Sequence, residues 1–229
     1  SRHEALIEFS NRHYYEGRLH VFPSAARKVD HLGISWHPTP GGIYYSAGGE
    51  PKTLERTNPK EAQALVDYLA ARLLATRPGE RSFGVVTFAL GQQRAVQELL
   101  DERRAEYPDL EAHFTGDEPV FIKNLENVQG DERDEILFSI GYARDQKGRL
   151  RMHFGPLSHA GGERRLNVAV TRARQQLRVF STLTHDQIDL SRTQSIGAAH
   201  LRDFLHYAAV HGGEETASPA SAKFNSPIE

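Results

Sequence analysis

The stretch from Gly161 to Leu183 constrains the fold most, because a helical pattern passes directly into a strand pattern. Leu166, Val170 and Ala173 recur at spacings of four and three, which predicts one apolar stripe along a helix. The alternation from Leu177 to Leu183 predicts a strand immediately afterwards. A helix followed so closely by a strand predicts that the helix packs against a sheet.

Two arginines in this stretch lie seven positions apart. Arg165 and Arg172 are separated by two helical turns, so the pattern predicts that they project from nearly the same helix face. Guanidinium groups held in fixed positions bind phosphate through charge and paired hydrogen bonds. Most arginines on a helix face are instead solvated or paired with surface carboxylates, and this segment alone leaves both interpretations open.

Upstream of this stretch, the sequence predicts further alternating helices and strands. Asn58 can cap a helix that has Pro59 in its first turn, and Ser82–Phe88 is the apolar run of a strand buried in a parallel sheet. A helix from Gly91 completes a strand–turn–helix unit, so Thr87 should lie at the carboxyl end of its strand, where α/β sheets bind ligands. The other expected elements are a helix within 1–17, a loop with a hairpin or strand pair within 18–56, strands at 120–123 and 136–140, and a last helix within 193–210.

Three segments resemble the motifs of one known family. RRLNVAVTRAR at 164–174 and LENVQGDERD at 125–134 resemble motifs VI and V of superfamily 1 nucleic-acid helicases, and GVVTFALGQQ at 84–93 resembles motif IV more weakly. The chain is thus similar to the second RecA-like motor domain of such a helicase, of the AAA_12 type. The resemblance covers about residues 1–207. It implies an α/β, P-loop NTPase-type fold with a central, mainly parallel sheet flanked by helices.

The resemblance also implies roles for single residues. Arg172 matches the arginine finger, which stabilises the charge that develops on a transferred γ-phosphate. Arg165 matches the leading arginine of motif VI and could instead pair with a carboxylate near the cleft. Gly130, preceded by Gln129, matches the motif V glycine beside the nucleotide, and Glu132 matches the acid that bonds the ribose. The segments also imply contacts to the nucleic-acid strand from Thr87 and Asn127.

The chain has no GxxxxGK[ST] sequence, so it lacks its own Walker A motif. The resemblance therefore implies that ATP and Mg²⁺ are bound mainly by a first RecA-like domain, and that this chain alone is inactive. The abrupt start of the sequence is expected of a piece cut from a longer protein. The wording of the motifs is closest to large bacterial multidomain helicase-like proteins, which often carry a restriction-endonuclease-like domain after the motor. We expect a single-stranded partner, with DNA favoured over RNA.

Two other function classes need to be weighed. One is a non-catalytic RecA-like module that docks a partner. The other is a metal-dependent nuclease, because Pro108-Asp109 and Asp145-Gln146-Lys147 mimic a PD…(D/E)xK pattern. The wide gap and the Gly-flanked turn around Asp145 disfavour the nuclease. The 12 histidines show no HExxH or clustered spacing, so no metal site is predicted.

Composition and charge set the remaining limits. The net charge is −2, yet residues 144–178 hold nine Lys/Arg against two acids, a local +7 that suits phosphate binding. Trp36, Tyr44 and Tyr45 could stack on bases, although aromatic residues in short strands more often pack. The chain has no cysteine and no apolar run of membrane-spanning length, which indicates a cytoplasmic protein without a membrane partner. Residues 1–211 are expected to form the motor domain and 212–229 a linker.

Overall fold

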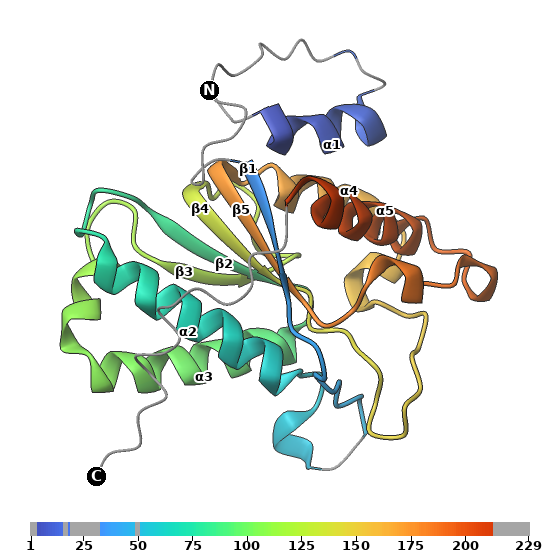
Figure 1. The fold of residues 1–229 in the computed structure, drawn as a ribbon, viewed down its shortest axis with the longest axis horizontal. Helices are drawn as coiled ribbons and strands as arrows, with labels where there is room; N and C mark the ends of the chain where they lie inside the picture. Colours follow the sequence, from blue (N-terminus) through green and yellow to red (C-terminus); the bar gives the residue numbers. More distant parts are fainter. Residues whose placement is uncertain (1–3, 16–17, 19–32, 49–50, 213–229) are drawn as a thin grey trace.

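The centre of the protein is a five-stranded sheet in which every pair of neighbouring strands is parallel (Figure 1). The computed structural model describes residues 4–15, 18, 33–48 and 51–212. The strand order is β1-β5-β4-β2-β3. The strands are β1 (Gly33–Pro38), β2 (Phe83–Thr87), β3 (Phe121–Asn124), β4 (Arg133–Ser139) and β5 (Ala173–Ser181). This confirms the predicted α/β class with a parallel central sheet.

Helices cover both faces of the sheet (Figure 1). On one face lie α1 (Glu4–Tyr14), α4 (Gly162–Val170) and α5 (Ile196–His211), and on the other lie α2 (Pro59–Ala75) and α3 (Leu90–Glu106). Short 3-10 helices are η1 (Lys52–Leu54), η2 (Pro108–Phe114), η3 (Gly155–Ser158), η4 (His185–Gln187) and η5 (Leu190–Arg192). In the described part of the chain, no helix is long and apolar enough to cross a bilayer.

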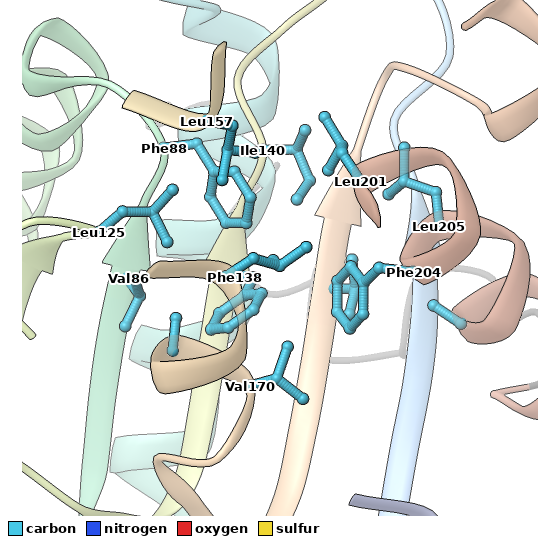
Figure 2. Close-up of a cluster of buried hydrophobic side chains, with 14 of the residues drawn as sticks. Val86, Phe88, Leu125, Phe138, Ile140, Leu157, Val170, Leu201, Phe204 and Leu205 are labelled. Atoms are coloured by element: carbon cyan, nitrogen blue, oxygen red, sulfur yellow. The ribbon is translucent and has the colours of Figure 1, made fainter. Parts of the chain in front are cut away.

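The central strands are apolar on both sides because both faces of the sheet are buried. Phe83 and Val85 of β2 pack toward α2 and α3, whereas Val86 packs toward α4 and α5. Figure 2 shows the second of these cores, where Phe138 of β4 lies beside Phe204 of α5, with ring centroids 5.8 Å apart. The continuous apolar strands predicted from the sequence are therefore explained by this layered burial.

The 3-10 helix η3 is wedged between α4 and α5. A Cβ atom added to Gly162 would lie 2.1 Å from the carbonyl oxygen of Leu157, and one added to Gly197 would lie 1.9 Å from the same oxygen. Only glycine allows the two helices to approach this backbone so closely. The preceding Gly161 has a φ of 77°, in the left-handed region that favours glycine. The Gly161-Gly162 pair thus has a packing role as well as the predicted role of a break before the helix.

Two predictions of local structure are wrong. The segment around PTPGG does not form a hairpin within the described residues, because β1 pairs in parallel with β5 and only an isolated antiparallel bridge joins Tyr45 to Thr57. Arg172 does not share a helix face with Arg165, because α4 ends at Val170 and β5 begins at Ala173. The pairing of Arg133 with Ala173 draws the chain into the sheet before the helical pattern is exhausted. The predicted linker lies outside the described residues apart from Gly212.

Candidate nucleotide and nucleic-acid sites

The parallel sheet divides the predicted site residues between its two edges. Thr87 ends β2, and the backbone N–H of Asn127 bonds the carbonyl of Asn124, the last residue of β3, so both lie at the carboxyl edge. Glu132 immediately precedes β4 and Arg172 immediately precedes β5, so both lie at the amino edge. The residues predicted to contact the nucleic-acid strand and those predicted to contact the nucleotide therefore lie on opposite edges of one sheet.

Arg172 lies in the turn between α4 and β5, and its side chain is held by that turn. Nε donates to the carbonyl oxygen of Val168 at 2.8 Å, and Nη2 donates to Oγ1 of Thr171 at 3.0 Å. A carbonyl in the last turn of a helix has no partner within the helix, so the guanidinium also acts as a cap for α4. The side chain is 17% exposed, which leaves part of the guanidinium accessible at the amino edge.

The segments that resemble motifs V and VI meet at this point. The N–H of Arg133 donates to the carbonyl oxygen of Arg172 at 3.2 Å, and Nη1 of Arg172 lies 3.7 Å from Oε1 of Glu132. Gly130 lies two residues before Glu132 with a φ of 91°, and nothing lies within 4 Å of an added Cβ. Glycine is needed there for its backbone conformation, and the surface beside it is open. Gln129 is exposed next to it.

Arg165 lies apart from this cluster. It is in the first half of α4, whereas Arg172 follows the end of that helix. Its Nη1 donates to the carbonyl oxygens of Pro156 and Ala160, both at 3.3 Å. In this structure Arg165 therefore joins η3 to the start of α4 and forms no ion pair with a carboxylate among the described residues. The expected pairing with a carboxylate is not observed.

Thr87 occupies the predicted place at the end of β2 but is fully buried. Its Oγ1 donates to the carbonyl oxygen of Ala89 at 3.2 Å, which fixes the turn into α3. Asn127 is exposed at the same edge. A strand contact by the Thr87 hydroxyl requires this turn to rearrange, whereas Asn127 is already accessible, and both roles stay predictions.

A buried polar network at the carboxyl edge was missed by the sequence analysis. Oε1 of Glu61 accepts hydrogen bonds from Oγ of Ser139 (2.9 Å) and from the N–H of Gly141 (2.6 Å). Its Oε2 accepts one from the N–H of Thr182 at 2.9 Å. The carboxylate thus joins the start of α2 to the ends of β4 and β5. Burial raises the pKa of Glu61 to about 7, although these hydrogen bonds act in the opposite direction.

The signal for this network was present in the sequence. Glu61 follows the helix-capping Asn58 by three positions, a spacing that by itself indicates only an acid near a helix start. Gln92, within the segment that resembles motif IV, donates to the carbonyl of Asn58 and to Oγ of Ser139, and accepts from the N–H of Asn58 at 2.7 Å. The two signals become one site only when the fold places α2, α3 and β4 together.

The local charge of +7 is partly neutralised by acids outside residues 144–178. Arg178 is buried, with Nε 2.6 Å from Oε1 of Glu135. Arg174 pairs with Glu118 at 2.5 Å and with Asp134 at 3.0 Å. The exposed cations that remain from the run are therefore fewer than the sequence count suggests. They are Arg144, Lys147, Arg149, Arg151 and Arg164.

The nuclease alternative finds no support in the geometry. Asp109 lies in η2, whereas Oδ1 of Asp145 accepts from the N–H groups of Lys147 and Arg149, both at 2.9 Å, and so fixes its own turn. No group of three or more potential metal ligands gathers anywhere in the described residues.

The family of the chain follows from a comparison with known families. The model of the AAA_12 family, described as an AAA domain, matches residues 2–184 and so includes all three motif-like segments. The chain belongs to this AAA domain family. The predicted resemblance to helicase motor domains is thereby confirmed at the level of the family.

Individual relatives carry helicase names. An uncharacterized ATP-dependent helicase of Mycoplasma genitalium is 33% identical over 206 residues, and its homologue in Mycoplasma pneumoniae is 32% identical over 209 residues. Each match covers 88% of this chain but only 17% of the relative. A crystal structure described as the C-terminal domain of a possible DNA helicase from Lactobacillus plantarum aligns with a TM-score of 0.41 and 13% identity, covering 89% of this chain and 95% of that one.

Proposed function

We propose that this AAA domain is the second motor domain of an ATP-dependent helicase or translocase, with Arg172 as its arginine finger. The observation that carries the proposal is the meeting of Arg172 with Glu132 at the amino edge, although 40 positions separate them in the sequence. One side chain can stabilise negative charge on a phosphate, and the other can accept a hydrogen bond from a ribose hydroxyl. In the proposal, the two side chains contact the same bound nucleotide, Arg172 at a phosphate and Glu132 at the ribose.

The chain's own residues fit a nucleotide from one side only. Arg172 and Glu132 offer a phosphate contact and a ribose contact, and the open backbone at Gly130 allows close approach. No Gly-rich loop with a lysine accompanies them in the sequence. ATP and Mg²⁺ would therefore be held mainly by a first RecA-like domain, and Mg²⁺ would offset phosphate charge there. A downstream endonuclease-like domain, a DNA rather than RNA track and a cytoplasmic location are further expectations of the same proposal.

In this mechanism Arg172 exchanges its local contacts for a phosphate oxygen when the two motor domains close. Its guanidinium would then stabilise the charge that spreads over the transferred phosphoryl group. Glu132 would orient the ribose, and Arg165 would act through the packing of η3 against α4. At the carboxyl edge, Asn127 and the turn at Thr87 would contact the single strand. Opening and closing of the cleft would move that strand.

The test is ATP hydrolysis by the full-length protein, with and without single-stranded DNA. We expect strand-stimulated hydrolysis in the wild type and a fall in kcat of about a hundredfold or more in Arg172→Ala. Arg164→Ala is the matched control, because Arg164 belongs to the same motif but its side chain is 87% exposed. An unchanged rate in Arg172→Ala would remove the finger role and favour a docking module.

A further inference from the structure

A cavity of about 480 Å³ opens at the carboxyl edge of the sheet. It lies between residues 44–47 with Arg56, the start of α3 and the segment 142–159. Its volume is within the range of small-ligand sites. Most of its lining comes from outside the three motif-like segments, and base stacking by Tyr44 is the role that the sequence suggested within it. Its lining includes Tyr44, Arg56, Leu90, Tyr142, Arg151 and His153.

One wall of the cavity is aromatic and rigid. The ring of Tyr44 is half-buried and lies 5.6 Å from the ring of Tyr142, at an interplanar angle of 57°. Tyr142 is fixed from behind, because its hydroxyl donates to the carbonyl oxygen of Phe88 at 3.0 Å. The N–H of Tyr44 donates to the carbonyl oxygen of Arg144, also at 3.0 Å. Leu90, which is 49% exposed, adds an apolar surface at the rim.

Cations flank this wall. Burial raises the pKa of Tyr44, and the guanidinium groups of Arg56 and Arg151 lower it, which places both charges near the phenol. The side chain of Arg56 is 60% exposed, and its ion pair with the adjacent Glu55 is long, at 4.0 Å. Arg151 and His153 are exposed. The guanidinium groups of Arg56 and Arg151 are therefore accessible to an anion in the cavity.

Arg56 also has an unusual backbone. Its φ is 60°, and it is the only non-glycine residue with a positive φ among the described residues. The N–H of Arg56 donates to the carbonyl of Tyr45 at 2.6 Å, which fixes the turn on one side. On the other side the start of α3 approaches closely, because a Cβ added to Gly91 would lie 2.8 Å from the carbonyl oxygen of Arg56. Glycine would adopt this conformation without strain. Backbone strain of this kind is typical of sites that bind ligands, so an arginine in place of glycine indicates a role for its side chain.

We propose that this cavity holds one nucleotide of the bound single strand, with its base stacked on Tyr44 and its flanking phosphates on Arg56 and Arg151. The inference rests on the proposed function and adds contacts beyond Thr87 and Asn127. Stacking on an aromatic ring accepts any base, and paired arginines grip the backbone, so the contact suits a motor that moves along a strand irrespective of sequence.

The experiment measures binding of the full-length protein to single-stranded DNA without nucleotide, over a range of salt concentrations. Tyr44→Leu should weaken binding about tenfold and leave the salt dependence unchanged, and Tyr44→Phe should keep wild-type affinity. Arg56→Gly should weaken binding and reduce the slope of log K against log salt by about 0.7, the value for one lost phosphate contact. Because glycine relieves the strained turn, Arg56→Gly should unfold at an unchanged or higher urea concentration.

The control is Arg104→Ala, which removes one positive charge from the last turn of α3, at the opposite edge of the sheet. It should bind like the wild type. Wild-type affinity and slope in both Tyr44→Leu and Arg56→Gly would overturn the inference and leave the Arg172 assignment intact. Equal losses in Tyr44→Phe and Tyr44→Leu would overturn the stacking role. A wild-type protein that binds no strand would overturn both this inference and the proposed function.

Discussion

The buried carboxyl group of Glu61 predicts an unusual dependence of stability on pH. The side chain is fully buried and accepts hydrogen bonds from Ser139, Gly141 and Thr182, and no ion pair to it is observed within the described residues. Desolvation disfavours the charged form, and this effect outweighs the three hydrogen bonds. The pKa of Glu61 accordingly rises from 4.5 to about 7 in the folded protein.

The direction of the effect is opposite to that of an ion-paired carboxylate. Between pH 4.5 and 7 the folded protein keeps a proton on Glu61 that the unfolded chain has released. Its contribution to stability is therefore fully present below pH 4.5 and is lost as the pH rises through 7. A shift from 4.5 to about 7 corresponds to about 3 kcal/mol of unfolding free energy.

Glu61→Gln isolates this effect, because glutamine is neutral at every pH. We expect the unfolding free energy of the variant to increase relative to that of the wild type by about 2.5 kcal/mol between pH 5 and pH 8, because most of the Glu61 contribution is lost within this range. Urea unfolding at several pH values measures it, and Glu98→Gln on the exposed side of α3 is the control. A difference that does not vary with pH would refute the reasoning. A wild type that gains stability toward pH 8 relative to the variant would show that the hydrogen bonds prevail over desolvation.

Two further substitutions test the packing and the buried charges. Gly197→Ala should lower the unfolding free energy by about 1–3 kcal/mol in a thermal melt, although alanine favours helices, because its Cβ would lie 1.9 Å from the Leu157 carbonyl oxygen. Glu135→Gln should cost about 3–5 kcal/mol in urea unfolding, because it leaves the buried guanidinium of Arg178 without its carboxylate. Burial raises the pKa of Glu135, but Arg178 and Arg72 lower it by more, so that the pKa lies below its usual value. The difference in unfolding free energy between wild type and variant should therefore shrink as the pH falls.

The sequence predicted the elements whose signals are local. Asn58 caps α2 by accepting a hydrogen bond from the N–H of Glu61, as its position before a proline indicated. The apolar run at 82–88 contains β2, and the last helix is α5. The strand β1 was harder to predict because its partner is remote: Ile34 pairs with Leu177, more than 140 positions away. Turn residues nearby suggested a hairpin, and only the completed sheet excludes it.

The candidate site was predicted in its composition but not in its geometry. The motif-like segments identified Arg172 and Glu132, and the fold brings them to 3.7 Å of each other. Helical spacing also predicted that Arg165 and Arg172 share a face, which fails because strand pairing ends the helix first. Charge counting along the chain failed for a related reason. Arg174 and Arg178 meet acids from β4 and its neighbourhood, and no window of sequence shows those partners.

The proposed function requires Arg172 to stay ordered in one domain and still serve another, and its contacts in this structure are compatible with both. Its partners are a helix-terminal carbonyl, a neighbouring hydroxyl and a carboxylate at 3.7 Å, beyond hydrogen-bond distance. The carbonyl of Val168 and the hydroxyl of Thr171 hold the guanidinium at the turn, and the carboxylate of Glu132 lies beside it at the amino edge. A phosphate can replace Glu132 without leaving a buried group unpaired, since Glu132 is itself 38% exposed. In the proposed function, moving Arg172 into the cleft therefore has a small energetic cost, and the larger charge of the phosphate decides the exchange.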